Sequence, residues 1–279
     1  MLEAQQHECN WWLTLTYDEE HLPIATQINL GEIELFPPED GSWNEGTLYP
    51  RHVTLFLKRL RKYFSEKGHT GIKYLYCGEY GETTHRPHYH MILFNCPLDP
   101  KEFYAPFVDK TFFKAHWKSH EIEKFWNHGM IDLTELEWNN AAYTCRYCMK
   151  KLMLQGSAEE KNWYYAKQGK EREFIRMSRR PGIGMTYYEQ HKDHIYETDS
   201  MYAFTINGVI NLKPPKAFDR KLEKENPELY NMIKESRKQC GKRNIDMLNS
   251  LNDQTDLQRI IMENEKLKTK ANMLPREAI

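Results

Sequence analysis

The chain of 279 residues is 40% hydrophobic and 28% charged, with 12 Phe and 17 Tyr, a composition that excludes wholesale disorder, a collagen-like fibre and a pure coiled coil. Its mean hydropathy of −0.81, with no run of about 18 apolar residues, predicts that no segment spans a membrane. The net charge is −1, yet residues 1–50 hold ten Asp/Glu and no Lys or Arg, so the remaining 229 residues carry +9.

The first predicted elements are a strand and a helix separated by a long insertion. Residues 11–17 are rich in strand-forming side chains and predict a strand. Residues 24–50 hold three Gly and three Pro, which is typical of an irregular segment with at most one short hairpin. Apolar residues then recur at helical spacing over residues 51–66, with basic residues on the other side, and predict an amphipathic helix.

Two strands joined by a short loop follow the helix. Residues 73–80 and 88–94 have strand patterns, and the loop 81–87 between them contains Gly and Pro. We therefore expect a hairpin.

The middle of the chain is expected to be mixed. Residues 100–127 are predicted to be mostly helical, and 130–138 to form a strand. The pair Asn139-Asn140 can cap a helix over residues 141–154. In the predicted helix of residues 100–127, the buried side would consist of four aromatic residues: Phe112, Phe113, Trp117 and Phe125.

The last third of the chain changes from basic and loop-like to helical. Residues 159–184 are expected to form loops, and residues 138–186 carry ten Lys/Arg against four Asp/Glu. Such a patch is either an ordinary solvated surface or a surface that meets a polyanion. Beyond residues 214–215 the sequence is polar and helix-prone, so we expect a core domain over 1–212 and a helical tail over 213–279.

One candidate metal site stands out. Side chains at i and i+2 of a strand share a face, so His88 and His90 lie side by side. Imidazole is the commonest metal ligand, although His-x-His pairs also arise by chance. Hairpin pairing places Glu79 opposite this face, and two imidazoles with one carboxylate leave open positions for catalysis. We expect His85, in the loop, to be a surface or substrate-contacting residue.

Two tyrosines on the predicted helix of residues 141–154 are candidate nucleophiles. Tyr143 and Tyr147 are four residues apart and share a face, which Lys150 and Lys151 continue. Most such pairs only pack a helix on a sheet. A phenol has a pKa near 10 and becomes a useful nucleophile where nearby cations stabilise the phenolate.

The two cysteines of this helix form a C-x-x-C pair. Cys145 and Cys148 have no second pair to complete a zinc ribbon and do not open a helix after a strand as a redox site would. We expect both to be small buried hydrophobes.

Three motifs resemble those of the HUH endonucleases that initiate rolling-circle replication, and in particular the initiators of microviruses of the gokushovirus branch. They are residues 14–17 (Thr-Leu-Thr-Tyr), Glu79 with residues 86–90 (Arg-Pro-His-Tyr-His), and the segment 143–151 with its two tyrosines. Residues 77–81 and 177–184 resemble the gokushovirus proteins as well. The resemblance weakens after residue 184 and fades beyond about residue 240.

Two departures from the family pattern are visible. Family members usually begin with a further stretch before a segment like residues 2–8, which indicates an N-terminally short chain. In the tyrosine helix, the two cysteines stand where small aliphatic or hydroxyl residues are expected.

The resemblance implies an α+β fold, a central antiparallel sheet with flanking helices of the ferredoxin or RRM-like kind. It implies a metal-dependent nicking and joining endonuclease acting on a single-stranded DNA origin through a 5′-phosphotyrosine, with Mg²⁺ or Mn²⁺ as cofactor. Host helicase and replication proteins are the further partners. No signal peptide is expected, and the cysteine usage favours a reducing compartment, so the host cytoplasm is the expected location. The residues expected to contact DNA are Arg86, Arg146, Arg176, Arg179 and Arg180.

Two alternatives remain open. Relaxases and transposases of the same superfamily are the first, although relaxases tend to carry an N-terminal Tyr with three histidines and single-tyrosine transposases are shorter. The second is a non-catalytic single-strand binding module that stacks bases on Trp11, Trp12 and Tyr17. That alternative leaves the metal ligands and the tyrosine pair unexplained.

Overall fold

The computed structural model describes residues 1–24, 46–81, 84–109, 114–152, 170–205, 208–251 and 256–273. Its regular elements, in chain order, are β1 Asn10–Thr16, α1 Pro50–Glu66, β2 Lys73–Tyr80, β3 Pro87–Phe94, β4 Phe103–Asp109, β5 Lys114–Ser119, α2 His120–Glu123, β6 Ile131–Glu135, α3 Trp138–Leu152, β7 Phe174–Met177, α5 Met185–Thr198, β8 Met201–Thr205, β9 Gly208–Leu212, α6 Lys216–Glu225, α7 Pro227–Leu251 and α8 Asp256–Met273.

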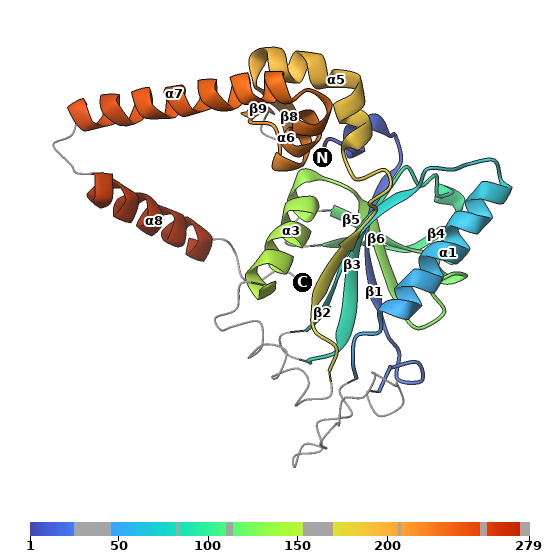
Figure 1. The fold of residues 1–279 in the computed structure, drawn as a ribbon. Helices are drawn as coiled ribbons and strands as arrows, with labels where there is room; N and C mark the ends of the chain where they lie inside the picture. Colours follow the sequence, from blue (N-terminus) through green and yellow to red (C-terminus); the bar gives the residue numbers. More distant parts are fainter. Residues whose placement is uncertain are drawn as a thin grey trace, which may run out of the picture. The chain divides into compact units, whose positions relative to one another are not determined.

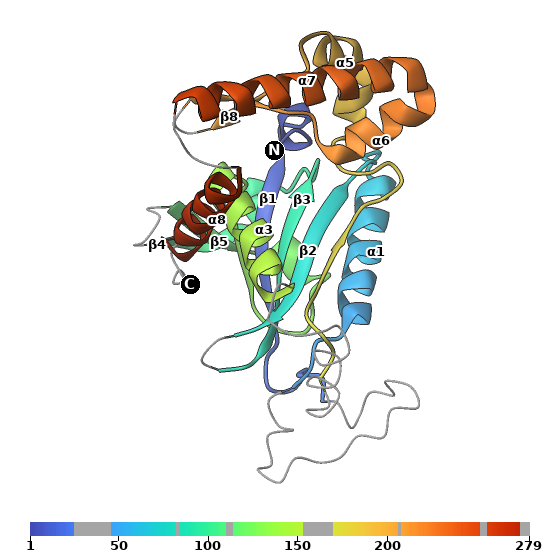
Figure 2. The same ribbon diagram turned by 60° about the vertical axis from the view of Figure 1, so that its left-hand side comes forward.

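A seven-stranded sheet in the order β4-β5-β6-β1-β3-β2-β7 forms the centre of the fold, and its strand pairs are antiparallel. Helix α1 covers one face of the sheet and α3 the other (Figures 1 and 2). The predicted α+β architecture is therefore confirmed. Strands β8 and β9 form a separate two-stranded sheet.

The core on the α1 side follows from the alternation of side chains along the strands. On β1, Leu13 and Leu15 are fully buried beneath α1, which contributes Phe56 and Leu60 to the same cluster. Each such burial contributes roughly 1.5–3 kcal/mol. The intervening residues of β1, among them Trp12, point to the α3 side, where a smaller cluster forms. Because β1 and β3 are buried on both faces, they fix the position of any site built on them.

The prediction of a mostly helical segment over residues 100–127 is wrong. Strands β4 and β5 occupy most of it, and the α-helix is confined to the short α2. Pro106 gives the physical reason, because proline breaks a helix interior but is tolerated at a bulge on an edge strand. The register of β4 against β5 shifts between Tyr104 and Phe107, on either side of Pro106, and β4 is the edge of the sheet.

The four aromatic residues expected on the buried side of that helix have separate outcomes. Phe125 is buried. Trp117 is half-buried on β5, its ring centroid 5.8 Å from that of Phe103 on β4. Phe112 and Phe113 lie outside the described residues.

Two smaller corrections concern the flanks of α3. The helix begins at Trp138 rather than Ala141, and Asn140 lies inside it, where its side-chain oxygen accepts a hydrogen bond from the Glu137 backbone N–H at 2.8 Å. Within the stretch expected to be loop-like, residues 174–177 form β7, which pairs with β2. Much of the rest of that stretch, and most of the insertion at 24–50, lies outside the described residues.

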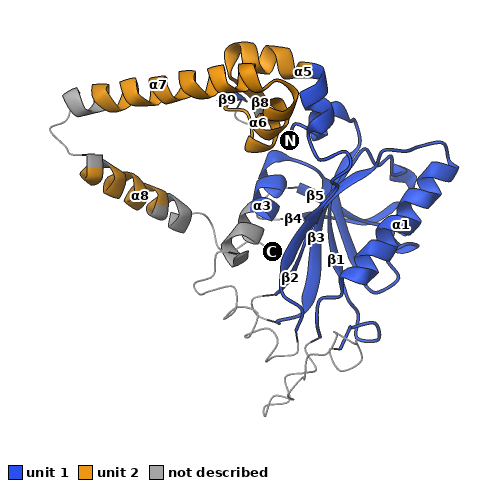
Figure 3. Cartoon of the chain, in the orientation of Figure 1, with its two compact units in different colours: residues 1–190, 203–210 blue, residues 191–202, 211–279 orange. Residues whose placement is uncertain are grey.

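The chain divides into two compact units, coloured separately in Figure 3. The first comprises residues 1–190 with 203–210, and the second residues 191–202 with 211–279. Within the second unit, Arg237 on α7 donates to Asp219 at 2.8 Å and to Asp199 at 3.0 Å. The boundary at residue 212 between a catalytic domain and a tail stays a prediction.

None of the helices in the described part of the chain is both long enough and apolar enough to cross a bilayer.

Candidate metal centre

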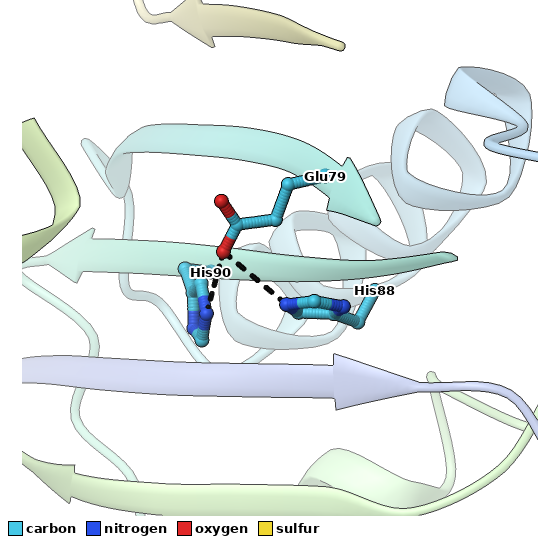
Figure 4. Close-up of side chains that lie close together, drawn as sticks. All are labelled: Glu79, His88 and His90. Carbon is cyan, nitrogen blue, oxygen red and sulfur yellow. Dashed lines mark hydrogen bonds and ion pairs between the residues drawn. The ribbon is translucent and has the colours of Figure 1, made fainter. Parts of the chain in front are cut away.

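The register of the β2–β3 hairpin brings the three predicted ligands together. Glu79 lies directly opposite His88, and Cys77 opposite His90. Because alternate residues share a face, all three candidate ligands point to the side of the sheet that carries α3. Figure 4 shows the carboxylate of Glu79 on β2 between the two imidazoles of β3.

The three side chains converge on one carboxylate oxygen. Glu79 Oε1 lies 2.8 Å from His90 Nε2 and 3.2 Å from His88 Nε2. One ligand atom from each residue lies within 4.8 Å of the other two. Glu79 and His90 are almost fully buried, whereas the His88 side chain keeps 20% of its surface exposed. An ion would therefore be approached from the side of His88.

The far nitrogen of each imidazole is also held. His88 Nδ1 lies 3.2 Å from the carbonyl oxygen of Arg86. Since a carbonyl only accepts, Nδ1 carries the proton, and in the neutral ring Nε2 keeps its lone pair for a cation. His90 Nδ1 lies 3.1 Å from Thr14 Oγ1 on β1, and the Trp12 ring stacks on His90 with centroids 5.1 Å apart. Such outer contacts fix the tautomer and orientation of metal-binding histidines.

The protonation states favour cation binding. Burial alone would raise the pKa of Glu79, but hydrogen bonds from His88 and His90 lower it to about 2, so the group is an anion at neutral pH. Burial lowers the pKa of His90 below its usual 6.5, which favours the neutral ring that binds metals. Two neutral imidazoles and one carboxylate fit a divalent cation and leave coordination positions open.

The helix that carries the predicted nucleophiles is anchored beside this triad. Tyr143 on α3 presents its ring edge-on to His90, with centroids 5.7 Å apart and planes at 88°. The indole N–H of Trp12 donates to Thr144 Oγ1 at 2.8 Å, and Thr144 is fully buried. The contact links β1 to α3 one residue from Tyr143, so it fixes the position of the first half of the helix.

This anchor gives a stability prediction. Thr144→Val keeps the shape of the side chain but leaves the buried indole N–H of Trp12 without an acceptor, which costs about 1–3 kcal/mol of unfolding free energy. Thr144→Ser should restore most of the loss. Chemical denaturation measures both, with Thr54→Val, on the exposed side of α1, as a control expected to change stability by less than about 0.5 kcal/mol. Equal losses in the Val and Ser variants would contradict the hydrogen bond.

Several predicted residues lie in α3 without described side chains. The backbones of Arg146, Tyr147, Lys150 and Lys151 continue the helix, and Tyr147 follows Tyr143 by about one turn. The structure places their backbones and leaves their roles as predictions. For the cysteines, the expectation is wrong at Cys145, which is exposed because it faces away from the sheet. The side chain of Cys148 is not described.

The arginines predicted to contact DNA are in different environments. The guanidinium of Arg86 pairs with Glu19 and donates to the carbonyl oxygen of Tyr17 at 3.1 Å, while its own carbonyl holds His88. Arg176 is exposed on β7, 5.0 Å over the ring of Phe174. Two further arginines that follow β7 are exposed: Arg179 and Arg180.

One polar pair beside the triad was missed from the sequence. Asp132 on β6 lies opposite Thr14, and its Oδ2 accepts a hydrogen bond from His116 Nδ1 at 2.7 Å. Its other oxygen is buried and has no hydrogen-bond partner among the described residues. No local signal could have revealed the pair, because it joins β5 to β6 and β5 lies where a helix was predicted.

The alternative of a base-stacking module loses its support. Trp11, Trp12 and Tyr17 are 9%, 1% and 4% exposed. Bases stack on exposed aromatic faces, and these three rings belong to the core.

The fold and site therefore define a class of protein in which an antiparallel sheet carries a His-x-His pair and an acid beneath a tyrosine-bearing helix. The chain belongs to the ORF2-type family of replication-associated proteins, which it matches over residues 10–152.

Three curated relatives extend the comparison. The chain is 38% identical over 238 residues to the replication-associated protein ORF2 of Spiroplasma virus 4, covering 85% of this chain and 65% of the relative. It is 30% identical over 154 residues to the replication-associated protein ORF4 of Chlamydia phage 1, covering 55% and 33%. It is 24% identical over 229 residues to the replication-associated protein VP4 of Bdellovibrio phage phiMH2K, covering 82% and 62%.

The resemblance to microvirus replication proteins is thereby confirmed. The matched part spans between one third and just under two thirds of the length of these relatives. No solved structure matches the chain significantly.

Proposed function

We propose that this chain is a metal-assisted endonuclease and strand transferase that nicks and rejoins single-stranded DNA at a phage origin, starting and ending rolling-circle replication. The observation that carries the proposal is the convergence of Glu79, His88 and His90 beside the ring of Tyr143. Membership of a replication-associated family supports DNA as the partner.

The triad would hold one divalent cation, Mg²⁺ or Mn²⁺. When bound, such an ion polarises a phosphate and stabilises the charge that develops on its oxygens. The contacts from Thr14 and from the Arg86 carbonyl oxygen hold the imidazoles in the orientation that leaves Nε2 available.

The chain's own nucleophile is a tyrosine of α3. In the proposed step, the tyrosine Oη loses its proton and forms a bond to phosphorus, while the bond from phosphorus to the 3′ oxygen breaks and that oxygen gains a proton. The product is a 5′-phosphotyrosine and a free 3′ hydroxyl. Because the phosphodiester has been exchanged rather than hydrolysed, the reverse attack by a 3′ hydroxyl can rejoin DNA without another source of energy.

Two groups are proposed to favour the phenolate. A nearby cation stabilises the deprotonated form of a phenol whose pKa is near 10. Lys150 and Lys151 follow Tyr147 by three and four residues on the same helix, which is the spacing at which helical side chains become neighbours. Host helicase and replication proteins are the proposed partners, and the host cytoplasm the proposed location.

The test is formation of a covalent adduct. Incubation with a library of single-stranded oligonucleotides and Mn²⁺ should give a protein–DNA species that survives SDS. Glu79→Gln, which removes the anionic ligand and keeps the shape, should form none. A pure binding protein gives no adduct under any condition, and that result would overturn the proposal.

A deletion tests the division of labour along the chain. Removing residues 245–279 keeps Arg237 and its ion pairs and leaves the triad and α3 intact. We expect oligonucleotide cleavage within about twofold of the full chain, because no group proposed for the chemistry is lost. A deletion variant that retains its circular dichroism spectrum but loses cleavage would contradict the assignment of catalysis to residues 1–212.

A further inference from the structure

A basic pocket lies at the opposite end of β2 from the metal centre. It has a volume of about 380 Å³ and is formed by the last turns of α1, the turn into β2 and the segment after β7. Three of its lining residues are strong cations, Arg61, Lys73 and Arg180, and no carboxylate lines it.

Only one of the three cations is neutralised. Lys73 Nζ lies 2.8 Å from a carboxylate oxygen of Glu3, which is itself buried. Arg61 and Arg180 have no carboxylate partner within the part of the chain that the structure describes. Arg61 is held by neutral groups, since its Nε and Nη2 donate to the carbonyl oxygen of Ile72 at 3.0 and 2.6 Å. The pocket therefore keeps two uncompensated guanidinium charges.

The pocket also keeps hydrogen-bond donors in reserve. The Nη1 group of Arg61 makes no hydrogen bond to any described residue. Ser178 Oγ accepts from the Tyr74 backbone N–H at 3.0 Å and from Arg61 Nη2 at 3.4 Å, which leaves its hydroxyl hydrogen to donate. Guanidinium and hydroxyl donors around a positive cavity match the oxygens of a phosphate group.

A line of exposed cations connects this pocket with the metal centre. Strand β7 is the edge of the sheet, and its first residue, Phe174, lies opposite Gly78, next to Glu79. Arg176 and Arg179 are exposed between that point and the pocket. Lys73 and Glu79 are six residues apart on one strand, so the pocket lies about 20 Å from the triad at about 3.3 Å per residue. That length corresponds to at most about six stacked nucleotides.

We propose that this pocket binds a backbone phosphate of the single-stranded DNA whose cleaved bond lies at the triad, and so holds the strand along the β7 edge. The inference rests on the proposed function for the identity of the ligand. Its ligand class is the phosphodiester of a polymer rather than a free phosphate ion, because one ion would lack the contacts along β7.

The experiment measures binding without metal, so that cleavage does not enter. Fluorescence anisotropy of oligothymidylates from about 4 to about 20 nucleotides should show that affinity rises once the strand spans both ends of β2. In the double variant Arg61→Gln with Arg180→Gln, this rise should disappear, and the slope of log K against log salt should fall by about 0.7 for each phosphate that the variant no longer binds.

The matched control removes two charges elsewhere on α1. Lys58→Gln with Lys62→Gln, both exposed and outside the pocket, should keep the rise with length. Equal losses in both double variants would show a general charge effect and overturn the proposal. Because Arg61 also supports the fold, Arg180→Gln alone, at an exposed position, must show part of the loss; wild-type behaviour of that variant would overturn the proposal.

Two further readouts separate this pocket from the proposed function. Inorganic phosphate should compete only weakly, and tight phosphate binding with no dependence on oligonucleotide length would overturn the proposal. If the wild type forms a covalent adduct but both pocket variants bind like it, the pocket assignment fails and the function stands. If no adduct forms but the pocket variants lose the length-dependent affinity, the pocket stands and the function fails.

Discussion

Replacing either histidine of the triad by alanine should abolish adduct formation and leave single-strand binding almost unchanged. Loss of one imidazole from a three-ligand site removes the cation, and the charge stabilisation it supplies is worth several kcal/mol, so the rate should fall on the order of 10³-fold. Most of the affinity for DNA comes from phosphate contacts elsewhere and should persist. Cleavage of a labelled oligonucleotide gives the rate, and calorimetric titration with Mn²⁺ gives the metal affinity.

The matched control is another histidine of the same hairpin. His85 is exposed in the loop before β3, at a positive φ of 52°. Asparagine tolerates this backbone conformation, so His85→Asn removes an imidazole without strain and should keep both metal binding and cleavage. A variant lacking both His88 and His90 that still nicks at the wild-type rate would contradict the site.

The second large effect is expected at the two tyrosines. Tyr147→Phe should reduce the first adduct more than Tyr143→Phe, because the two lysines that follow Tyr147 within one turn favour its phenolate. The double variant should form no adduct. In one round of replication, the first tyrosine holds the 5′ phosphate while the regenerated origin must be cut again, and the second tyrosine supplies that nucleophile.

Circle closure separates the two roles. Tyr143→Phe should allow the first adduct and impair release of a closed circle, which a circular product assay on a substrate with two origin copies would detect. If Tyr143→Phe were silent in both nicking and closure, Tyr143 would be a packing residue against His90 and the enzyme would use a single tyrosine.

The ligands could be predicted because their geometry is local. His88 and His90 share a face through the strand period, and Glu79 follows from the short loop of one hairpin. The register of that hairpin confirms the pairing. Helix α1 was equally accessible, since its apolar stripe extends over four turns.

The rest of the site depends on contacts between distant segments. Trp12 meets Thr144 across 132 residues, and Thr14 meets His90 across 76. The sequence contains each residue but no signal for its partner. Local patterns also failed where two rules competed: the aromatic spacing around Pro106 resembled a helix, while proline and the open edge of the sheet favoured a bulged strand. Strand β7 has four residues, too few for periodicity to identify it.

Mapping the covalent link by mass spectrometry tests the central claim most directly. The wild-type chain, incubated with single-stranded DNA and Mn²⁺, would be digested with trypsin and nuclease, and the residual nucleotide located on a peptide. Trypsin cuts after Arg146, so the peptides that contain Tyr143 and Tyr147 separate. We expect the nucleotide on the Tyr147 peptide first and on the Tyr143 peptide in later cycles. No adduct from a chain that binds both Mn²⁺ and DNA, or an adduct on a residue outside α3, would contradict the account.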